Sequence, residues 1–531
     1  MSFISMDFAL FVTVALILYY ALPKKCQWVV LLVASLTFYA QTDPKDFIYI
    51  ITTTVSTYIC AALIEDRSKK QKLYLEENKD TLSKEEKKQY KAKVKAVQKR
   101  FLISCLVLNI GILAYLKYAN ISIAYINLFR LTYFNSTEFI PFIRVLLPLG
   151  ISFYTFQTMG YIIDIYYGKY ERERNLFRFA LYVSFFPQIL QGPISRFGNL
   201  APSLYGEKSF DFNRIRSGFY RIVWGLFKKL VIADRLASFV SSVMSAKESY
   251  PGLYILLAVF FYSMQIFGDF SGGIDVALGV SEMFGVTLPE NFERPFFSKS
   301  ISEYWQRWHI TLGSWFKDYI FYPLSLNKSI IRFSKKVRQM GLETFGKRIP
   351  IYIPMFFVWL LTGMWHGSQS RYVVWGLFNF VFIVLGTELE PLSLKITTRY
   401  SLKESSFFMR AYRVIKTFAL MSFLRLFDIN ADTAGAFRAF RLCFTGWKSF
   451  DITKVFEELS LPAEDFYVAV IAVILLFIFE LIQRKGSVRV RIFALPVAVQ
   501  WVILSALITI VSVFGYYGPG YDAASFIYGA F

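Results

Sequence analysis

Residues 466–481 read FYVAVIAVILLFIFEL, and this stretch decides the class of fold. An α-helix needs about 20 mostly apolar residues to cross the ~30 Å hydrocarbon core of a bilayer. We therefore predict an all-α, polytopic transmembrane protein with about ten to twelve membrane-embedded helices. Nine other apolar blocks support this prediction: Phe8–Leu22, Trp28–Ala40, Phe47–Leu63, Phe101–Leu116, Val145–Tyr167, Leu253–Phe267, Ile351–Leu361, Val373–Leu385 and Ala494–Phe514.

Composition agrees with a membrane location. The 531 residues are 55% hydrophobic and 18% charged, which is less charge than globular proteins carry. The net charge of +21 would suggest nucleic acid as a partner of a soluble protein, but here the basic residues follow the positive-inside rule, so we expect no nucleic acid. An outside amino terminus places these basic segments on the cytoplasmic face: Lys24 with Lys25, 67–100, 169–174, 328–348 and 395–416.

We predict one membrane domain over residues 1–531. Its largest polar interruption, 67–100, has mixed charge and helix-forming residues, and we interpret it as a cytoplasmic basic helical insertion that is either solvated or laid on anionic lipid headgroups. The first apolar block is expected to remain as a span, because no cleavage site follows it. The isolated cysteines, Cys26, Cys60, Cys105 and Cys443, suggest neither a disulfide framework nor a metal site.

Only two histidines, His309 and His366, occur in the chain. Imidazole titrates near neutral pH, so each is a candidate general base. The alternative for each is a hydrogen-bonded core residue. Gly363 and Gly367 flank His366 with little bulk, which favours space for a substrate beside it.

His309 follows a helix start signal. Ser300 and Glu303 fit a capping box, so a helix should begin at Ile301, and aromatic residues then recur at helical spacing as far as Tyr319. In such a continuous amphipathic helix, His309 falls on the border of the apolar face and should be half buried. An interfacial helix whose histidine only caps its polar edge is the alternative.

Two other segments place polar groups in apolar surroundings. Asp269 and Asp275 occur with four small residues beside an apolar block, which favours close helix packing around a polar pocket. Residues 186–196 break a helix with two prolines and include Gln191 and Arg196, so this segment either borders a wet cavity or is a surface loop.

These residues carry a close resemblance to a known family. The sequence is similar to bacterial membrane-bound O-acyltransferases, and within them to the alginate O-acetylation (AlgI-like) branch. The matching motifs extend from Leu147 to Gly376, so the resemblance places the catalytic core region at 147–376. They are Asp269–Gly272, Pro289–Phe292, Ser300–Leu312, Ser152–Gln157, Asp164, Pro187–Arg196, Gly363–Gly367 and Trp375 with Gly376.

The resemblance implies a ring of helices around a thin, funnelled centre, with re-entrant and interfacial helices, in the bacterial inner membrane. It implies His366 as the catalytic histidine and His309 as a second functional one. The donor would be acetyl-CoA or an acyl-carrier thioester, with no bound cofactor. A separate extracytoplasmic acyltransferase (SGNH or AlgJ/AlgX-like) would complete transfer onto a polysaccharide. The expected substrate route contains Trp305, Trp308, Trp365, Asp269, Asp275, Asn291, Arg307, Gln191 and Arg196.

The charge pattern adds a topological hypothesis. If 328–348 and 395–416 are both cytoplasmic, His366 lies toward the outer leaflet and His309 toward the cytoplasm. The two histidines would then mark opposite ends of one transmembrane route. His366 is expected to act as a general base on an acceptor hydroxyl, with an acyl-histidine intermediate as the alternative. Asp269 and Asp275 either orient a histidine or stabilise helix contacts.

Three other functions compete with O-acetyl transfer to a polysaccharide. A D-alanyl transferase to teichoic acid (DltB-like) would use an aminoacyl carrier protein. A lipid-modifying member of the family would bind a hydrophobic acceptor. A polysaccharide flippase would need no base and should tolerate the loss of both histidines.

Overall fold

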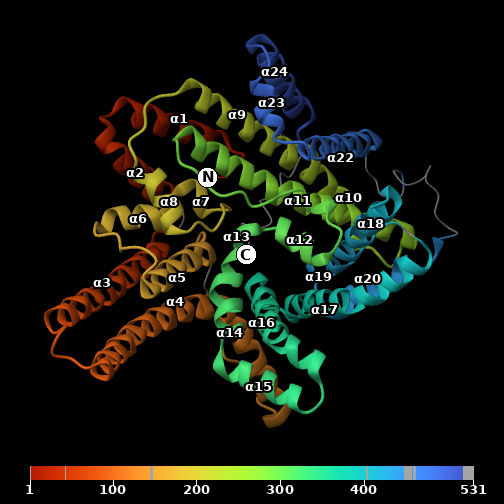
Figure 1. Cartoon of the computed structure of the whole chain (residues 1–531). Helices are drawn as coiled ribbons and strands as arrows, with labels where there is room; N and C mark the ends of the chain where they lie inside the picture. The colour runs from red at the N-terminus through yellow and green to blue at the C-terminus, as the bar shows by residue number, and fades with distance from the viewer. Residues whose placement is uncertain are drawn as a thin grey trace. The chain divides into compact units, whose positions relative to one another are not determined.

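The computed structural model describes residues 2–41, 43–143, 147–401, 403, 405–447, 457 and 462–517. Within these residues the chain is helical, and its only extended pairing is an isolated β-bridge between Phe292 and Trp308 (Figure 1). The predicted all-α fold is confirmed. The residues group into two compact units, Met1–Phe212 with Ser281–Leu288 and Asn213–Val280 with Pro289–Phe531.

Seven described helices are long and apolar enough to cross a membrane, so the chain is a multi-pass membrane protein. The count of ten to twelve also included shorter blocks, which form helices such as α2 and α5, of 13 and 17 residues. The seven segments are Pro44–Glu77, Lys84–Phe134, Gly252–Met283, Glu343–His366, Ser370–Arg399, Ala463–Gln483 and Val497–Phe514.

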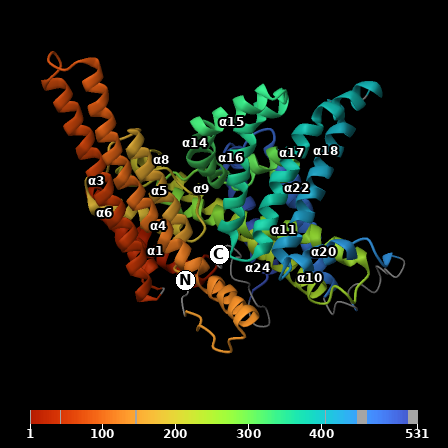
Figure 2. The same ribbon diagram turned by 90° about the horizontal axis from the view of Figure 1, so that it is seen from below.

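The first unit is built around a long helical pair. Helices α3 and α4 lie side by side, and Ser83 and Glu86 form a capping box at the start of α4 (Figure 2). The predicted insertion 67–100 is the end of this pair, so its helical character is confirmed. The helices of the unit are α1 Met6–Ala21, η1 Lys24–Cys26, α2 Gln27–Tyr39, η2 Pro44–Asp46, α3 Phe47–Glu77, α4 Lys84–Phe134, α5 Ile151–Tyr167, α6 Leu176–Ser184, α7 Phe186–Ile189 and α8 Phe197–Tyr205.

The proline-containing segment of the first unit is interrupted, as predicted. Helix α6 ends at Ser184, and the short helix α7 begins at Phe186. Its side chains are enclosed by protein: Gln188 is 3% exposed and Gln191 is 0% exposed. The alternative of a surface loop is therefore wrong.

The second unit contains both histidines. Its elements are α9 Phe212–Leu226, η3 Phe227–Ala233, α10 Asp234–Ser245, α11 Gly252–Met283, η4 Pro295–Phe297, α12 Ile301–Arg307, α13 Ile310–Phe316, η5 Lys317–Phe321, α14 Tyr322–Ser325, α15 Lys328–Gln339, α16 Glu343–His366, α17 Ser370–Arg399, α18 Phe407–Leu424, α19 Leu426–Ile429, α20 Thr433–Leu442, α22 Ala463–Gln483, α23 Val488–Phe493 and α24 Val497–Phe514. The first residue of α9 and the last three of α11 belong to the first unit.

Glycines bring α11 close to α9 and η3. A Cβ on Gly272 would lie 2.7 Å from the Gly225 carbonyl oxygen, and one on Gly279 would lie 2.6 Å from that of Gly218. Small residues permit such close backbone approach between membrane helices. The predicted close packing beside Asp269 and Asp275 is therefore confirmed.

Candidate functional site

The site begins with a helix that breaks at His309. Ser300 caps α12 as predicted, because its side chain accepts a hydrogen bond from the Glu303 amide. The helix then ends at Arg307, and His309 adopts a left-handed conformation with φ 50°. The predicted continuous helix is wrong, and so is the half-buried histidine: His309 is 3% exposed at the start of α13.

Asn291 holds the broken segment in place. Its side-chain oxygen lies 3.3 Å from His309 Nδ1 and accepts hydrogen bonds from the Thr311 amide at 3.0 Å and the Thr311 hydroxyl at 2.8 Å. Its carbonyl accepts from the Ile310 amide at 3.0 Å. Asn291 is 0% exposed, so one buried amide side chain fixes both the backbone turn and the ring of His309.

An aromatic and cationic cluster supports the residue before His309. Trp308 stacks on Tyr304 with an interplanar angle of 14°, and the Arg425 guanidinium lies 4.7 Å from the Trp308 ring centroid. Arg425 is 3% exposed, donates to the Tyr304 hydroxyl at 3.2 Å and pairs with Asp428 at 3.0 Å. This buried cation thus clamps the last turn of α12 through cation–π and hydrogen-bond contacts.

His366 is the last residue of α16 and is 6% exposed. A Cβ on Gly363 would lie 2.4 Å from the Tyr372 carbonyl oxygen, and one on Gly367 would lie 2.4 Å from the Tyr372 ring. The space that the glycines leave is therefore filled by α17. The expectation that they open a path for substrate is wrong at these two positions, because they serve helix packing.

Trp365 lies between the two histidines. Its ring centroid is 5.7 Å from that of His309 and 4.9 Å from that of His366. The histidines are therefore separated by no more than the sum of these distances, well short of the ~30 Å bilayer core. They cannot mark opposite ends of a route through a full-thickness bilayer, and any passage between them is short.

Trp305 belongs to a neighbouring tryptophan cluster. Its indole N–H donates to the Asn379 side chain at 2.9 Å, and its ring centroid lies 4.9 Å from Trp359 and 5.6 Å from Trp375. Trp375 also contacts His366, with centroids 4.7 Å apart. The structure thus joins Trp305, Trp365 and both histidines in one aromatic site.

The acidic candidates occupy ion pairs between helices. Asp269 pairs with Lys229 at 2.6 Å, and Lys229 also pairs with Asp234 at 2.9 Å. Asp275 pairs with Lys228 at 2.6 Å and with Arg221 at 2.9 Å. Of the two roles considered for these aspartates, the contacts favour stabilisation of the α11–η3 interface.

The remaining candidates lie outside the aromatic site. Arg307 pairs with Glu303 of its own helix at 2.7 Å. Gln191 and Arg196 belong to the first unit, whereas the histidines belong to the second. Their part in a common route remains a prediction.

Burial determines the protonation state of His309. Burial lowers the pKa of His309 to about 3, so its ring is neutral at physiological pH and holds a proton weakly. A neutral imidazole can donate one hydrogen bond from one ring nitrogen and accept one at the other. His366 is placed differently, at a helix end beside Trp365 and Trp375.

Sequence reasoning missed several residues around the histidines, among them Trp359, Tyr372, Asn379 and Arg425. Asn379 had a usable signal, since it is the polar residue within the apolar block 373–385. Arg425 carried no such signal, because α18, which precedes it, is not among the predicted apolar blocks. Among the described residues, no group of three or more His, Cys, Asp or Glu side chains suits a metal ion.

Fold and site together define a polytopic membrane protein with a buried two-histidine centre. Residues 172–430 match the model of MBOAT, the membrane-bound O-acyltransferase family, and this range includes both histidines. Residues 172–430 are therefore similar to the membrane-bound O-acyltransferase family, as the resemblance indicated.

Three curated relatives show the range of similar proteins. The chain is 34% identical over 303 residues to a probable alginate O-acetylase, AlgI, of Pseudomonas syringae pv. tomato, covering 56% of this chain and 54% of that protein. It is 29% identical over 310 residues to the peptidoglycan O-acetyltransferase of Helicobacter pylori, covering 54% of each. It is 30% identical over 237 residues to the teichoic acid D-alanyltransferase of Bacillus subtilis, covering 44% of this chain and 58% of that protein. The chain spans about half the length of the relatives it matches.

Proposed function

We propose that this protein is an O-acyltransferase that passes an acetyl group from a cytoplasmic thioester towards a cell-surface or exported polysaccharide. The observation that carries the proposal is the pair of buried histidines on either side of Trp365, inside the region that matches the acyltransferase family. The named functions of the alginate and peptidoglycan relatives favour acetyl as the acyl group and a polysaccharide as the acceptor.

In the proposed reaction, His366 removes the proton from an acceptor hydroxyl. The hydroxyl oxygen attacks the thioester carbonyl, the carbon–sulfur bond breaks, and the protonated imidazole returns its proton to the thiolate. General acid–base catalysis of this kind contributes about 10²- to 10⁴-fold. In the alternative, His366 itself accepts the acyl group and passes it on. His309, held by Asn291, orients the donor or its neighbours.

The remaining elements of the proposal follow the resemblance. The donor is acetyl-CoA or an acyl-carrier thioester, and a separate extracytoplasmic acyltransferase completes the transfer. The protein lies in the bacterial inner membrane with its amino terminus outside. Its helices form a ring around a thin, funnelled centre. The short distance between the histidines supports a thin centre of this ring, because a single aromatic site could then be reached from both faces of the membrane.

Mass spectrometry of cell-surface glycans tests the proposal. Cells with the intact protein should carry a substituent of the mass of one acetyl ester, and cells that produce His366→Ala at the same membrane level should lack it. An unchanged acetyl content in cells with the variant would contradict the proposal.

A D-alanyl transferase is the second candidate, and the similarity to the Bacillus subtilis protein is the observation that favours it. It would leave an alanyl ester, which differs in mass from an acetyl ester. It would also copurify with a small acyl carrier protein. A flippase, by contrast, would lose no function with His366→Ala.

A further inference from the structure

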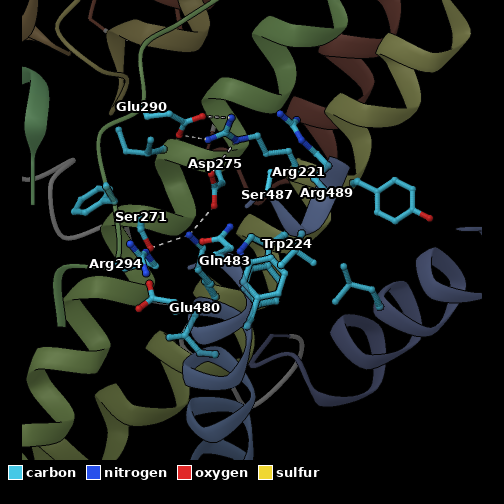
Figure 3. A pocket seen from close by; sticks show the side chains of 18 of the residues that line it. Arg221, Trp224, Ser271, Asp275, Glu290, Arg294, Glu480, Gln483, Ser487 and Arg489 are labelled. Carbon is cyan, nitrogen blue, oxygen red and sulfur yellow. Dashed lines mark hydrogen bonds and ion pairs between the residues drawn. The ribbon is translucent and has the colours of Figure 1, made fainter. Parts of the chain in front are cut away.

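A cavity in the second unit lies beside the aromatic site and is not used in the proposed reaction. It has a volume of about 690 Å³ and is lined by α9, η3, α11, the segment before α12, the start of α13, and α22 to α24 (Figure 3). This volume falls within the range of roughly 300–1,000 Å³ that is typical of ligand-binding pockets. Much of its wall, from Leu476 to Ile510, lies outside the region that matches the acyltransferase family.

One part of the cavity is apolar and faces two candidate membrane spans. Leu476 and Phe479 of α22 and Leu507 of α24 contribute to it, and Phe479 stacks on Trp224 with ring centroids 4.1 Å apart. From Ile503 to Ile510 the wall follows α24 for about 10 Å at 1.5 Å per residue. Both helices leave most of their apolar residues outside the protein core. This wall suits a lipid acyl chain.

The opposite part of the cavity is charged, and two of its cations already have close partners. Arg221 pairs with Asp275 at 2.9 Å and with Glu290 at 2.5 Å. Lys228 pairs with Asp275 at 2.6 Å and donates to the Ser271 hydroxyl at 2.8 Å. The charges of Arg221 and Lys228 are therefore already balanced by residues of the protein.

Two other charged groups have partners only at long range. Glu480 is 6% exposed, and its carboxylate has no hydrogen bond or ion pair among the described residues, although the charges of Lys228, Arg294 and Arg307 act on it. Arg294 lies 3.9 Å from Glu293, a long pair with a 69% exposed carboxylate. A buried carboxylate requires a donor, and a guanidinium binds phosphate well. Glu480 and Arg294 both line the cavity (Figure 3), so a ligand there would meet an acceptor and a cation.

The lining carries as many acidic as basic side chains. The basic ones are Arg221, Lys228, Arg294 and Arg489, and the acidic ones are Asp275, Glu290, Glu293 and Glu480. A balanced lining favours a ligand with both charges over one with a net negative charge. Because Arg484 and Lys485 directly follow α22, we expect this end of the helix at the level of the lipid headgroups.

We propose that the cavity binds one zwitterionic phospholipid with an ethanolamine headgroup. Its phosphate lies against Arg294, its primary ammonium donates to Glu480, and one acyl chain lies along α22 and α24. The site is separate from the histidine centre, although Phe292 and Ile310 of its wall are the chain neighbours of Asn291 and His309. The proposal does not depend on acyl transfer.

Lipid retention by the full-length protein tests this site. The protein is purified in detergent, delipidated, and mixed with phosphatidylethanolamine, phosphatidylcholine or phosphatidylglycerol of the same chain length, and native mass spectrometry counts the lipid that stays bound. We expect about tenfold tighter retention of phosphatidylethanolamine, because its ammonium N–H groups form a charged hydrogen bond that the other two headgroups cannot form. Free phosphoethanolamine, which lacks the chain, should not displace it.

Two pairs of variants assign the effect to the cavity. Glu480→Gln should lose the preference for phosphatidylethanolamine, whereas Glu464→Gln, an exposed change on the same helix, should keep it. Arg294→Gln should weaken retention of all three phospholipids, whereas the exposed Arg399→Gln should not. Equal retention of the three lipids by the unmodified protein, or identical behaviour of Glu480→Gln and Glu464→Gln, would overturn the proposal.

A second measurement does not depend on the charged variants folding. Brominated acyl chains quench nearby tryptophans, and Trp224 lines the cavity. Phosphatidylethanolamine with brominated chains should quench the unmodified protein more than Trp224→Phe at low lipid ratio. Equal quenching of the two proteins would also overturn the proposal.

Discussion

His309 occupies a backbone conformation that few residues adopt, and this determines which substitutions can test it. Its φ of 50° lies in the left-handed region, where Asn is the best tolerated residue after Gly. Asn at position 309 therefore removes the imidazole with little backbone strain. The ring's neutral state follows from burial, so its effect should appear in the pH dependence of stability.

We expect His309→Asn to reduce the sensitivity of the protein to acid. The folded pKa is about 3 and the unfolded pKa about 6.5, so unfolding takes up a proton between these values. The intact protein should therefore lose up to about 1.4 kcal/mol per pH unit through this residue as the pH falls below about 6.5. The midpoint of thermal unfolding in detergent, measured from pH 7.5 to 5 for the intact protein and for His309→Asn, tests this expectation. The same pH dependence of the midpoint in both proteins would contradict it.

The residues around His309 also show which parts of the site the sequence could predict. The capping signal at Ser300 and Glu303 is local, so it was sufficient to place the start of α12. The break at His309 depends on Asn291, which lies 18 residues earlier in the chain. A helical periodicity contains no information about such a contact, and it therefore extended the helix too far.

Helices α16 and α17 show the same limit at the scale of elements. Apolar length predicted both helices, because crossing a bilayer depends on composition along one segment. The small size of Gly363 and Gly367 predicts open space beside His366, whereas an added Cβ at either position would meet Tyr372 of α17. Which residue fills a glycine's space depends on the partner helix, and a single sequence does not contain that pairing.

Gly376 provides a test of this packing. A Cβ there would lie 2.4 Å from the Trp359 carbonyl oxygen, so Gly376→Ala should destabilise the protein by about 1–3 kcal/mol through overpacking. Gly386 lies on the same helix with nothing within 4 Å of an added Cβ, so Gly386→Ala should be neutral or slightly stabilising. Thermal unfolding compares the two variants, and equal midpoints would show that α16 and α17 are not in close contact.

The ion pairs between η3 and α11 should also be measurable. Lys229→Met leaves Asp234 and Asp269 buried without their shared cation, and removing one partner of a buried pair costs about 3–5 kcal/mol. Adding Asp234→Asn and Asp269→Asn should recover much of the loss, because no buried charge remains. Denaturation of the single and triple variants in detergent decides this, and a single variant as stable as the intact protein would refute a structural role for Lys229.

At the scale of the whole molecule, the distribution of basic residues predicts the orientation in the membrane. Residue 88 lies near the end of the α3–α4 pair, which we expect in the cytoplasm. In a cysteine-free background, Lys88→Cys should react with a membrane-impermeant maleimide only after the cells are opened. Labelling in intact cells would place this pair outside and reverse the proposed topology.

The single membrane domain predicted from the sequence remains a proposal at this scale. Composition was enough to establish a multi-pass helical protein, because long apolar segments have few other uses. The grouping of the residues into two compact units was not predicted from the sequence, although the polar segment 206–211 lies at their boundary.

The central claim is that His366 performs acyl transfer in a centre that it shares with His309. The most direct measurement is the rate of transfer of labelled acetyl from a thioester donor to the acceptor fraction, in membranes with equal amounts of each protein. Met364→Ala, two residues away on the same helix and 36% exposed, is the matched control. We predict a loss of about 10²- to 10⁴-fold for His366→Ala and a near-normal rate for Met364→Ala. Transfer at the normal rate by His366→Ala would contradict the account.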